Sequence, residues 1–305
     1  MLPAVLPFPD IGPEIVSVSI GGFDLALRWY ALAYIVAILG GWGLARLALS
    51  RPRWWPGDQP PMTRRQLEDA ITWVTLGIVL GGRLGYVVFY QPGYYLANPA
   101  EILAVWQGGM SFHGGLIGTG LGLIVFALRS GVPVRRILDL AALSTPLGLL
   151  LGRLANFVNA ELWGRPSTLP WAVIFPGDAA QACANVGELC ARHPSQIYEA
   201  LLEGLVLGAA LWWLTLRRGA LRRPGLLGGL FLAGYGAARA FVELFRQADA
   251  QYVTPANPQG HVLAMGEWGL TMGQALSLPM IAIGLCAALW ALRRPPPRPA
   301  PARRA

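Results

Sequence analysis

Charged and polar side chains interrupt the long apolar stretches of this sequence, and they are the residues best suited to chemistry. A charge inside a hydrocarbon layer is costly unless it is paired or hydrated, so each such residue is a candidate for function. Five short segments hold these residues. The candidates are Arg83 in GGRLGYVVFY; His113 in WQGGMSFHGGLIGTGLG; Arg153, Asn156 and Glu161 in GRLANFVNAELWG; His193, Ser195, Gln196, Tyr198, Glu199 and Glu203 in RHPSQIYEALLEG; and Tyr235, Arg239, Glu243 and Arg246 in GYGAARAFVELFR.

Two of these segments have a spacing that places polar side chains on one helical face. Arg153 and Asn156 are three residues apart, so both address the same side of a helix. Tyr235, Arg239 and Glu243 recur every four residues. Arg239 and Glu243 therefore form a pair of opposite charge on neighbouring turns.

Arginines at the depth of lipid headgroups suit a phosphate ligand. A guanidinium group binds phosphate through two hydrogen bonds and stays charged at any accessible pH. A neutral imidazole, such as that of His113, can take or relay a proton near pH 7. These residue types predict a phospholipid site with an acid–base group. Structural roles are the alternative: an ion pair for Arg239 and Glu243, packing for His113, and pairing with a neighbouring acid for Arg83.

The elements that position these residues follow from composition. Hydrophobic residues make up 54% of the 305 residues, charged residues make up 13%, and the mean hydropathy is +0.47. One soluble core cannot bury that much apolar surface, so the chain needs lipid as its solvent. We predict an all-α integral membrane protein, a bundle of seven transmembrane helices, each long enough to cross about 30 Å of hydrocarbon. The predicted spans are 29–49, 70–90, 111–128, 137–158, 196–216, 226–244 and 272–292.

The segments that join the spans alternate in charge. All 24 basic residues are arginine; 16 lie in one set of segments and three in the alternate set. By the positive-inside rule, the basic set faces the cytoplasm, which places the N-terminus outside and the C-terminus inside. This sidedness argues against nucleic acid as a partner. The basic segments are 51–65, 129–136, 217–223 and 293–305, and the others are 91–109, 159–193 and 246–269.

The same topology brings several candidates to one level of the membrane, the outer ends of the spans. These are His113, Arg153, Glu161, Glu199, Glu243 and Arg246. Convergence from separate segments favours a shared site over scattered structural roles.

The remaining segments complete the domain organisation. Residues 1–28 carry three acidic residues and several prolines, a composition unlike a cleavable signal peptide. We predict one catalytic domain over 1–292, with an outer-face loop region at about 159–193. The Pro- and Arg-rich tail, 293–305, is predicted to be disordered in the cytoplasm.

Cysteine and histidine usage limits metal chemistry. Cys183 and Cys190 lie in the outer-face loop region, where an oxidising compartment would permit a disulfide, and the sequence leaves their pairing open. Cys286 lies in the last span and is expected to pack. No cluster of histidine, cysteine and acidic residues has metal-ligand spacing, so we expect no metal.

The segment GRLANFVNAELWG at 152–164 resembles the signature of the prolipoprotein diacylglyceryl transferase family, of form G-R-x-[GA]-N-F-x-N-x-E-x-x-G. Its eight specified positions all match. The resemblance extends over nearly the whole chain. Further matching stretches are RWYALAY at 28–34, GGRLGYVVFY at 81–90, WQGGMSFHGGLIG at 106–118, RHPSQIYE at 192–199, GYGAAR…VELFR at 234–246 and MGQALSLPM at 272–280.

The resemblance implies an enzyme of the bacterial cytoplasmic membrane, with seven spans and a periplasmic N-terminus. Such enzymes move the sn-1,2-diacylglyceryl group of phosphatidylglycerol onto the lipobox cysteine thiol of a prolipoprotein signal peptide. A thioether forms and glycerol-1-phosphate leaves, the first step of lipoprotein maturation. The expected partners are phosphatidylglycerol, the signal peptide and membrane lipid, and no cofactor is expected.

The resemblance also implies roles for individual residues. Arg153 and Arg239 would hold the phosphate and stabilise the leaving group, and His113 is the candidate base for the thiol. Deprotonation assisted by arginine alone, without a discrete base, is the alternative. The other residues expected to bind phosphatidylglycerol are Asn156, Glu161, Tyr30, Tyr235, Glu243, Arg246 and Arg83.

A transporter or flippase for an anionic lipid or small anion is the competing function. It explains arginines within the membrane and a glycine-rich helix equally well, but it does not explain the signature. The sequence also has no internal repeat of the kind found in many transporters. A scaffold that only binds lipid is a third possibility. Turnover of the lipid, as opposed to its movement across the bilayer, distinguishes the enzyme from the transporter.

Overall fold

The computed structural model describes residues 5–20, 23–183, 189–248, 250–265 and 268–294, most of which are helical. Helices cover all seven predicted spans. In chain order they are α1 (Trp29–Leu49), α2 (Arg64–Phe89), α4 (Phe112–Ser130), α5 (Val134–Val158), the continuous run of α7 (Ser195–Glu199), η5 (Ala200–Val206) and α8 (Leu207–Arg218), then α9 (Leu226–Val242) and α10 (Met272–Arg293).

Five of these helical segments are long and apolar enough to cross a membrane: α1, α2, α5, the run Ser195–Arg218, and α10. The other two, Gly114–Ser130 within α4 and α9, are shorter apolar helices. The protein is therefore a mostly helical one with at least these five candidate membrane spans among its described residues.

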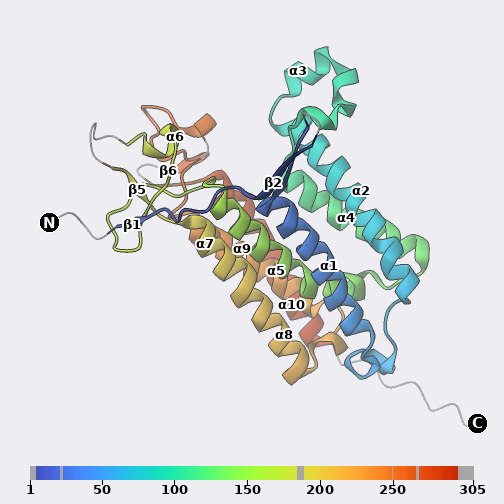
Figure 1. Cartoon of the computed structure of the whole chain (residues 1–305). Helices are drawn as coiled ribbons and strands as arrows, with labels where there is room; N and C mark the ends of the chain where they lie inside the picture. Colours follow the sequence, from blue (N-terminus) through green and yellow to red (C-terminus); the bar gives the residue numbers. More distant parts are fainter. Residues whose placement is uncertain (1–4, 21–22, 184–188, 249, 266–267, 295–305) are drawn as a thin grey trace, which may run out of the picture.

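The strands and several of the short helices gather at one end of the bundle (Figure 1). Strand β1 lies parallel to β4, which pairs antiparallel with β5, and two hairpins are separate from this sheet. The small elements are β1 (Leu6–Pro7), β4 (Val173–Ile174), β5 (Ala191–Arg192), the hairpin of β2 (Glu14–Ile20) and β3 (Phe23–Arg28), the hairpin of β6 (Leu263–Met265) and β7 (Trp268–Leu270), and the helices α3 (Pro92–Ala97), η3 (Pro99–Leu103), η4 (Val105–Gln107) and α6 (Asp178–Gln181).

The hairpin of β2 and β3 is not among the predicted elements. Alternating apolar residues in EIVSVSI, followed by two glycines in the sequence, are the signal that indicates it. Helix α2 also begins six residues earlier than predicted. Thr63 forms a capping box there, because its hydroxyl accepts from the Gln66 amide at 3.2 Å while the Gln66 side chain accepts from the Thr63 amide at 2.9 Å.

A seam of glycines joins α2 to α4. A Cβ atom placed on Gly118 would lie 2.8 Å from the Gly81 Cα atom, and one placed on Gly85 would lie 2.7 Å from the Gly114 Cα atom. The two backbones are therefore in direct contact, which only small residues at four-residue spacing allow. This packing accounts for the glycine-rich segment around His113. The seam consists of Gly77, Gly81 and Gly85 on α2 and of Gly114, Gly118 and Gly122 on α4.

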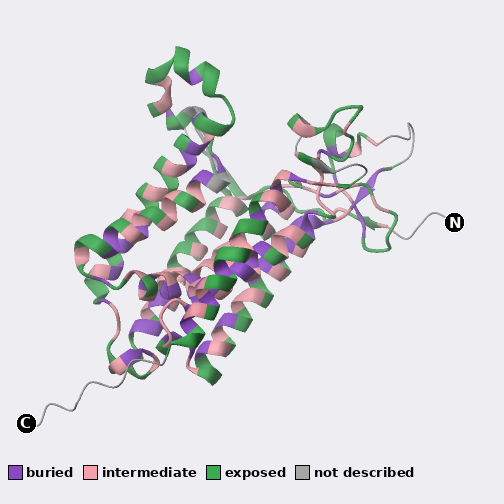
Figure 2. Ribbon diagram, turned by 180° about the vertical axis from the view of Figure 1, so that it is seen from behind, coloured by how far each residue is buried: buried purple, intermediate pink, exposed green. Residues whose placement is uncertain are grey.

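A second close contact joins α9 to α10. A Cβ atom on Gly229 would lie 2.8 Å from the Gly284 carbonyl oxygen, and one on Gly284 would lie 2.6 Å from the Gly229 oxygen. Bundle helices thus meet at glycine pairs, and their outer faces remain apolar. Leu39, Leu80 and Leu128 are 57–70% exposed on these faces. Figure 2 shows the exposed residues along the outer sides of the helices, the surface that lipid covers in a membrane protein.

Asp139 anchors α9 at the end of the bundle opposite the strands. Its carboxylate is fully buried and accepts from the backbone amides of Gly225 at 2.6 Å and Gly228 at 2.8 Å. A carboxylate in this position satisfies free amides and complements the helix dipole. Because the start of α9 is fixed, the position along the bundle axis of residues at its other end, such as Arg239, is fixed as well.

Cys183 and Cys190, whose pairing the sequence leaves open, form a disulfide. The Gln181 side chain supports this turn by accepting from the Cys190 amide at 3.0 Å and donating to the Phe175 carbonyl at 2.7 Å. Of the predicted cytoplasmic tail, residues 295–305 lie outside the described part of the chain.

Candidate functional site

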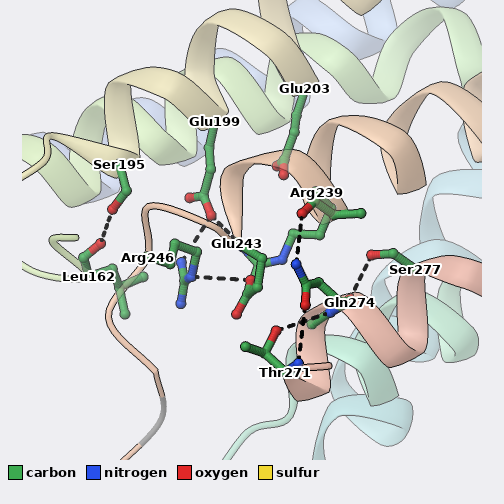
Figure 3. Close-up of polar contacts among 12 residues, drawn as sticks. Leu162, Ser195, Glu199, Glu203, Arg239, Glu243, Arg246, Thr271, Gln274 and Ser277 are labelled. Carbon is green, nitrogen blue, oxygen red and sulfur yellow. Dashed lines mark hydrogen bonds and ion pairs between the residues drawn. The ribbon is translucent and has the colours of Figure 1, made fainter. Parts of the chain in front are cut away.

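Six charged side chains converge at one end of the bundle. Figure 3 labels Glu199, Glu203, Arg239, Glu243 and Arg246. The six side chains come from three segments that are distant in the sequence: α5, the continuous run of α7 and η5, and the end of α9. We name this set the arginine–glutamate cluster: Arg153 from α5, Glu199 from α7, Glu203 from η5, Arg239 from α9, and Glu243 and Arg246 from the residues that follow α9.

Glu199 is the centre of the cluster. Its side chain is fully buried, and one oxygen, Oε2, lies 3.0 Å from the Nε atom of Arg153. The other oxygen, Oε1, lies 2.9 Å from the NH1 atom of Arg246 and also pairs with the NH1 atom of Arg239. One carboxylate thus holds three guanidinium groups together, and mutual attraction offsets the cost of burying the four charges.

Glu243 forms a second link between two of these arginines. Its Oε2 atom lies 2.9 Å from the NH2 atom of Arg239 and 3.7 Å from the Nε atom of Arg246. The first turn of α10 makes room for this carboxylate, because a Cβ atom on Gly273 would lie 2.6 Å from the Glu243 Cδ atom. Arg239 is therefore held from two sides, by Glu199 and by Glu243.

Glu203 is the least satisfied member of the cluster. Its side chain is fully buried and its Oε2 atom lies 3.8 Å from the Nε atom of Arg153. Neither carboxylate oxygen has a hydrogen-bond partner among the residues that the structure describes. Glu203 lies in η5, a seven-residue π-helix, and such segments are frequent at functional sites.

A second polar group lies beside the cluster on α5. The Asn156 amide donates to the Tyr30 hydroxyl at 2.6 Å and to the Glu161 carboxylate at 2.8 Å. Asn156 is one turn from Arg153, as its spacing predicts, so the helix places both groups on one side. The structure thereby brings together three of the residues expected to bind the headgroup.

The backbone around Glu161 is strained. Ala160 and Leu162 have φ angles of 53° and 58°, the left-handed region that residues with a Cβ atom rarely adopt. Two side chains from α7 stabilise this turn, because Gln196 donates to the Glu161 carbonyl at 2.6 Å and Ser195 donates to the Leu162 carbonyl at 3.0 Å. Strain of this kind clusters at functional sites.

Arg83 does not join the cluster. Its guanidinium group donates to the carbonyl oxygens of Ile102 at 2.9 Å, Glu101 at 2.6 Å and Gly108 at 2.5 Å, and it lies 5.1 Å from the ring centre of Tyr95. These contacts tie the 101–109 segment to α2. That segment leads directly into α4.

Two further predicted residues lie on α4 and α9. His113 is in the first turn of α4, and its side chain lies outside the described part of the structure. Tyr235 is buried on α9, one turn before Arg239. It packs near Phe231, with ring centres 6.0 Å apart.

Aromatic side chains border the site on the side of the strands. The His193 Nδ1 atom lies 3.1 Å from the Tyr198 hydroxyl, and the rings of His193, Tyr198 and Phe245 contact one another. Burial lowers the pKa of His193 below its ordinary value, so this imidazole is neutral at pH 7. Trp171 donates to the same hydroxyl at 2.8 Å.

The arrangement suits an anionic ligand. Guanidinium groups that are already oriented by carboxylates cost little further ordering when they bind a phosphate. Among the described residues, no group of three or more metal-ligating side chains is present. The sequence flags Glu199 and Glu203 but assigns neither a role. The signal is that these two acids lie four residues apart on an apolar span of a chain that also has arginines within its spans. Acids in that position are expected to pair with those arginines.

The fold and the site define a class: a helical integral membrane protein with a buried cluster of arginines at one end of its bundle. Comparison with known proteins identifies the family. The prolipoprotein diacylglyceryl transferase family matches residues 16–290, and this chain belongs to it. The protein is therefore an enzyme, a transferase of a bacterial inner-membrane family.

Close relatives carry the same name. A phosphatidylglycerol–prolipoprotein diacylglyceryl transferase of Ruegeria pomeroyi is 63% identical over 282 residues, which cover 92% of this chain and 96% of the relative. The protein of that name from Roseobacter denitrificans is 60% identical over 282 residues, with the same coverage. One from Sinorhizobium medicae is 48% identical over 291 residues, 95% of this chain and 94% of the relative.

Proposed function

We propose that this chain transfers the sn-1,2-diacylglyceryl group of phosphatidylglycerol to the lipobox cysteine thiol of prolipoproteins. The names of its relatives support the two substrates. The observation that carries the assignment of the site is the convergence of three arginines on the buried Glu199 carboxylate. The transporter alternative has no support from these relatives.

The transfer makes one bond and breaks one. The cysteine sulfur forms an S–C bond with the glyceryl carbon that carries the phosphate, and the C–O bond to that phosphate breaks. The bonding electrons stay on the phosphate oxygen of glycerol-1-phosphate, and the thiol proton leaves. The site must therefore stabilise a phosphate that gains charge and must lower the cost of forming a thiolate.

Arg153 and Arg239 are the residues proposed to stabilise the phosphate as it gains charge. Their side chains are only 13–14% exposed, stay charged and come from facing helices, so a phosphate between them would contact two guanidinium groups. Glu243 would orient Arg239 through the contact at 2.9 Å. Arg246, held by the same two glutamates, would contact the headgroup or the peptide.

Asn156, Glu161 and Tyr30 are proposed to position the glycerol headgroup. Their hydrogen bonds to one another leave a polar surface one turn from Arg153. Tyr235 would line the site next to Arg239. These groups would position the lipid and would take no part in making or breaking bonds.

His113 is proposed as the base that takes the thiol proton, and deprotonation assisted by arginine remains the alternative. Positive charge nearby lowers the pKa of a thiol from about 8.5. Arg83 would act indirectly in lipid binding, because its hydrogen bonds to Ile102, Glu101 and Gly108 fix the backbone that leads to His113.

We further propose seven membrane crossings, with α4 and α9 added to the five longer spans. The N-terminus would be periplasmic and the C-terminus cytoplasmic. Supporting this, the arginine-rich linkers join helices at one end of the bundle, and the arginine–glutamate cluster lies at the other. The site would then open at the outer leaflet.

The test is transfer of labelled glyceryl from phosphatidylglycerol to a lipobox peptide by the purified chain. Wild type and Arg65→Ala should label the peptide, since Arg65 is exposed at the start of α2. Arg153→Ala and Arg239→Ala should label it about a hundredfold more slowly or not at all. If the His113→Ala variant is nearly as active as wild type, the transferase function stands and His113 is excluded as the base. No transfer by folded wild type would exclude the function.

A further inference from the structure

Glu203 has no assigned part in the transfer, yet its surroundings are unusual. It is fully buried, and its two carboxylate oxygens have no hydrogen-bond partner among the described residues. The cation nearest to it in the cluster, the Nε atom of Arg153, is 3.8 Å away. A buried carboxylate without hydrogen bonds is costly in its ionised form.

The charges around Glu203 decide which form it takes. Arg153, Arg239 and Arg246 contribute three permanent positive charges. Glu199 and Glu243 contribute two negative charges, and each is in contact with arginines at 2.9–3.0 Å. With Glu203 ionised the cluster is neutral, and with Glu203 protonated the cluster carries one positive charge.

The helices α5, α7, α8 and α9 pack against η5. Arg153 faces Glu203 from α5, Glu199 from α7, and Tyr235 and Arg239 from α9, with Arg246 just beyond. On α8 the ionisable residues are Arg217 and Arg218, at the far end of that helix. Because Glu199 is held by three arginines and a tyrosine is neutral near pH 7, Glu203 is the group in this set able to change charge there.

The position of Glu203 is fixed. Gly204 lets η5 approach α5 so closely that an added Cβ atom would lie 2.6 Å from the Leu150 Cβ atom and 2.7 Å from its Cα atom. The Glu203 side chain is also fully buried, so its carboxylate has no contact with water in this structure. Its charge must be compensated where it stands, by Arg153 or by a proton.

We propose that binding of the lipid phosphodiester is coupled to the uptake of one proton by Glu203. The phosphodiester brings one negative charge to a neutral cluster. Protonation of Glu203 restores neutrality and removes one of the two negative charges that Arg153 faces, the other being Glu199. This inference rests on the proposed function in that it takes phosphatidylglycerol as the ligand. It adds that the empty and the lipid-bound sites differ by one proton.

The experiment is a titration of the purified protein, in weakly buffered detergent at pH 8, where the empty site is ionised at Glu203, with short-chain phosphatidylglycerol and a pH-indicator dye. Wild type and the control Glu68→Gln, an exposed acid on α2, should take up about one proton for each lipid bound. Glu203→Gln should bind the lipid with no uptake. Short-chain phosphatidylcholine, whose headgroup is neutral overall, should cause none in any variant.

The affinity gives a second readout. For wild type, coupling to one proton makes the dissociation constant for phosphatidylglycerol rise by about tenfold per pH unit above neutrality. For Glu203→Gln the constant should be independent of pH, and Glu203→Asp, which keeps the carboxyl group, should restore the dependence. Folding of each variant is checked by its thermal unfolding.

Lipid binding by wild type without proton uptake would overturn the proposal, as would uptake that persists in Glu203→Gln or appears equally with phosphatidylcholine. Transfer of glyceryl to a lipobox peptide is measured on the same preparations. Transfer without proton uptake would remove this coupling and leave the transferase intact. Proton-coupled lipid binding without transfer would support the coupling at Glu203 and exclude the transferase function.

Discussion

At the scale of single residues, the site depends on one carboxylate. Glu199 pairs with Arg153, Arg239 and Arg246, so its charge is what allows three guanidinium groups to lie together in a low-dielectric environment. The remaining acids have separate parts: Glu243 orients Arg239, and Glu203 lies against Arg153. Removing any acid changes both the geometry and the net charge of the cluster.

Replacing Glu199 with glutamine should abolish transfer and lower stability. The amide keeps the size of the side chain but leaves three arginines without their shared counter-charge. Loss of one partner of a buried ion pair costs about 3–5 kcal/mol. Thermal unfolding in detergent measures this loss, and Glu68→Gln is the control. Unchanged unfolding of Glu199→Gln would mean that Glu199 does not hold the arginines together.

Replacing Arg239 with lysine should leave the fold intact and lower the transfer rate by about a hundredfold. Lysine keeps the charge, but an ammonium group is a point charge that cannot contact Glu199, Glu243 and a phosphate in one plane. Initial rates of peptide labelling, compared with Arg65→Lys, test this. A rate for Arg239→Lys close to that of wild type would show that charge alone is sufficient at this position.

At the scale of elements, glycine contacts set the distances between helices. The seam between α2 and α4 leaves no space for a methyl group at Gly118, whereas a methyl group at Gly120 on the same helix meets nothing within 4 Å. The first turn of α4 carries His113, so the seam also fixes the height of that residue relative to Arg83 on α2.

The variant Gly118→Ala should be less stable than wild type by about 1–3 kcal/mol because the two backbones must separate. Its matched control, Gly120→Ala, should be neutral or slightly more stable, since alanine favours helix over glycine. Thermal unfolding of the two variants measures the difference. Equal stability would contradict direct backbone contact between α2 and α4.

At the scale of the whole molecule, the arginine-rich linkers and the arginine–glutamate cluster lie at opposite ends of the bundle. The arginine-rich linkers lie at the end where Asp139 caps α9, and the arginine–glutamate cluster, the disulfide and the strands lie at the other. A disulfide is typical of an oxidising compartment. Both features agree with a site that faces the periplasm.

Single cysteines introduced into a Cys286→Ala background should report this orientation. With the outer membrane permeabilised, an impermeant maleimide should label Leu96→Cys in α3, because this position is on the predicted periplasmic side and is exposed. The same reagent should label Gln59→Cys only after the inner membrane is opened. Labelling of Gln59→Cys in intact inner membranes would reverse the proposed topology.

The sequence predicts the helices well because each has to be apolar over its own length. Helix α1 coincides with the predicted span 29–49, and the other six differ mainly where a cap such as Thr63 extends a helix. The hairpin of β2 and β3 is missed, since short exposed strands have no comparable apolar signal. The spacing of Arg153 and Asn156 places them on neighbouring turns of α5, because helix geometry is local. Their contacts differ, since Arg153 pairs with Glu199 whereas Asn156 donates to Tyr30 and Glu161.

What the sequence by itself determined is the membrane as solvent, the candidate polar residues and, through its signature, the family. Only the tertiary structure decided which of those residues meet. Arg83 and Arg239 look alike in sequence, as single arginines in glycine-rich apolar helices. In the fold, Arg83 binds the carbonyl oxygens of a loop, and Arg239 meets Glu199 from another helix. Apolar length is a property of one segment, whereas the partner of a buried charge depends on which segments pack together.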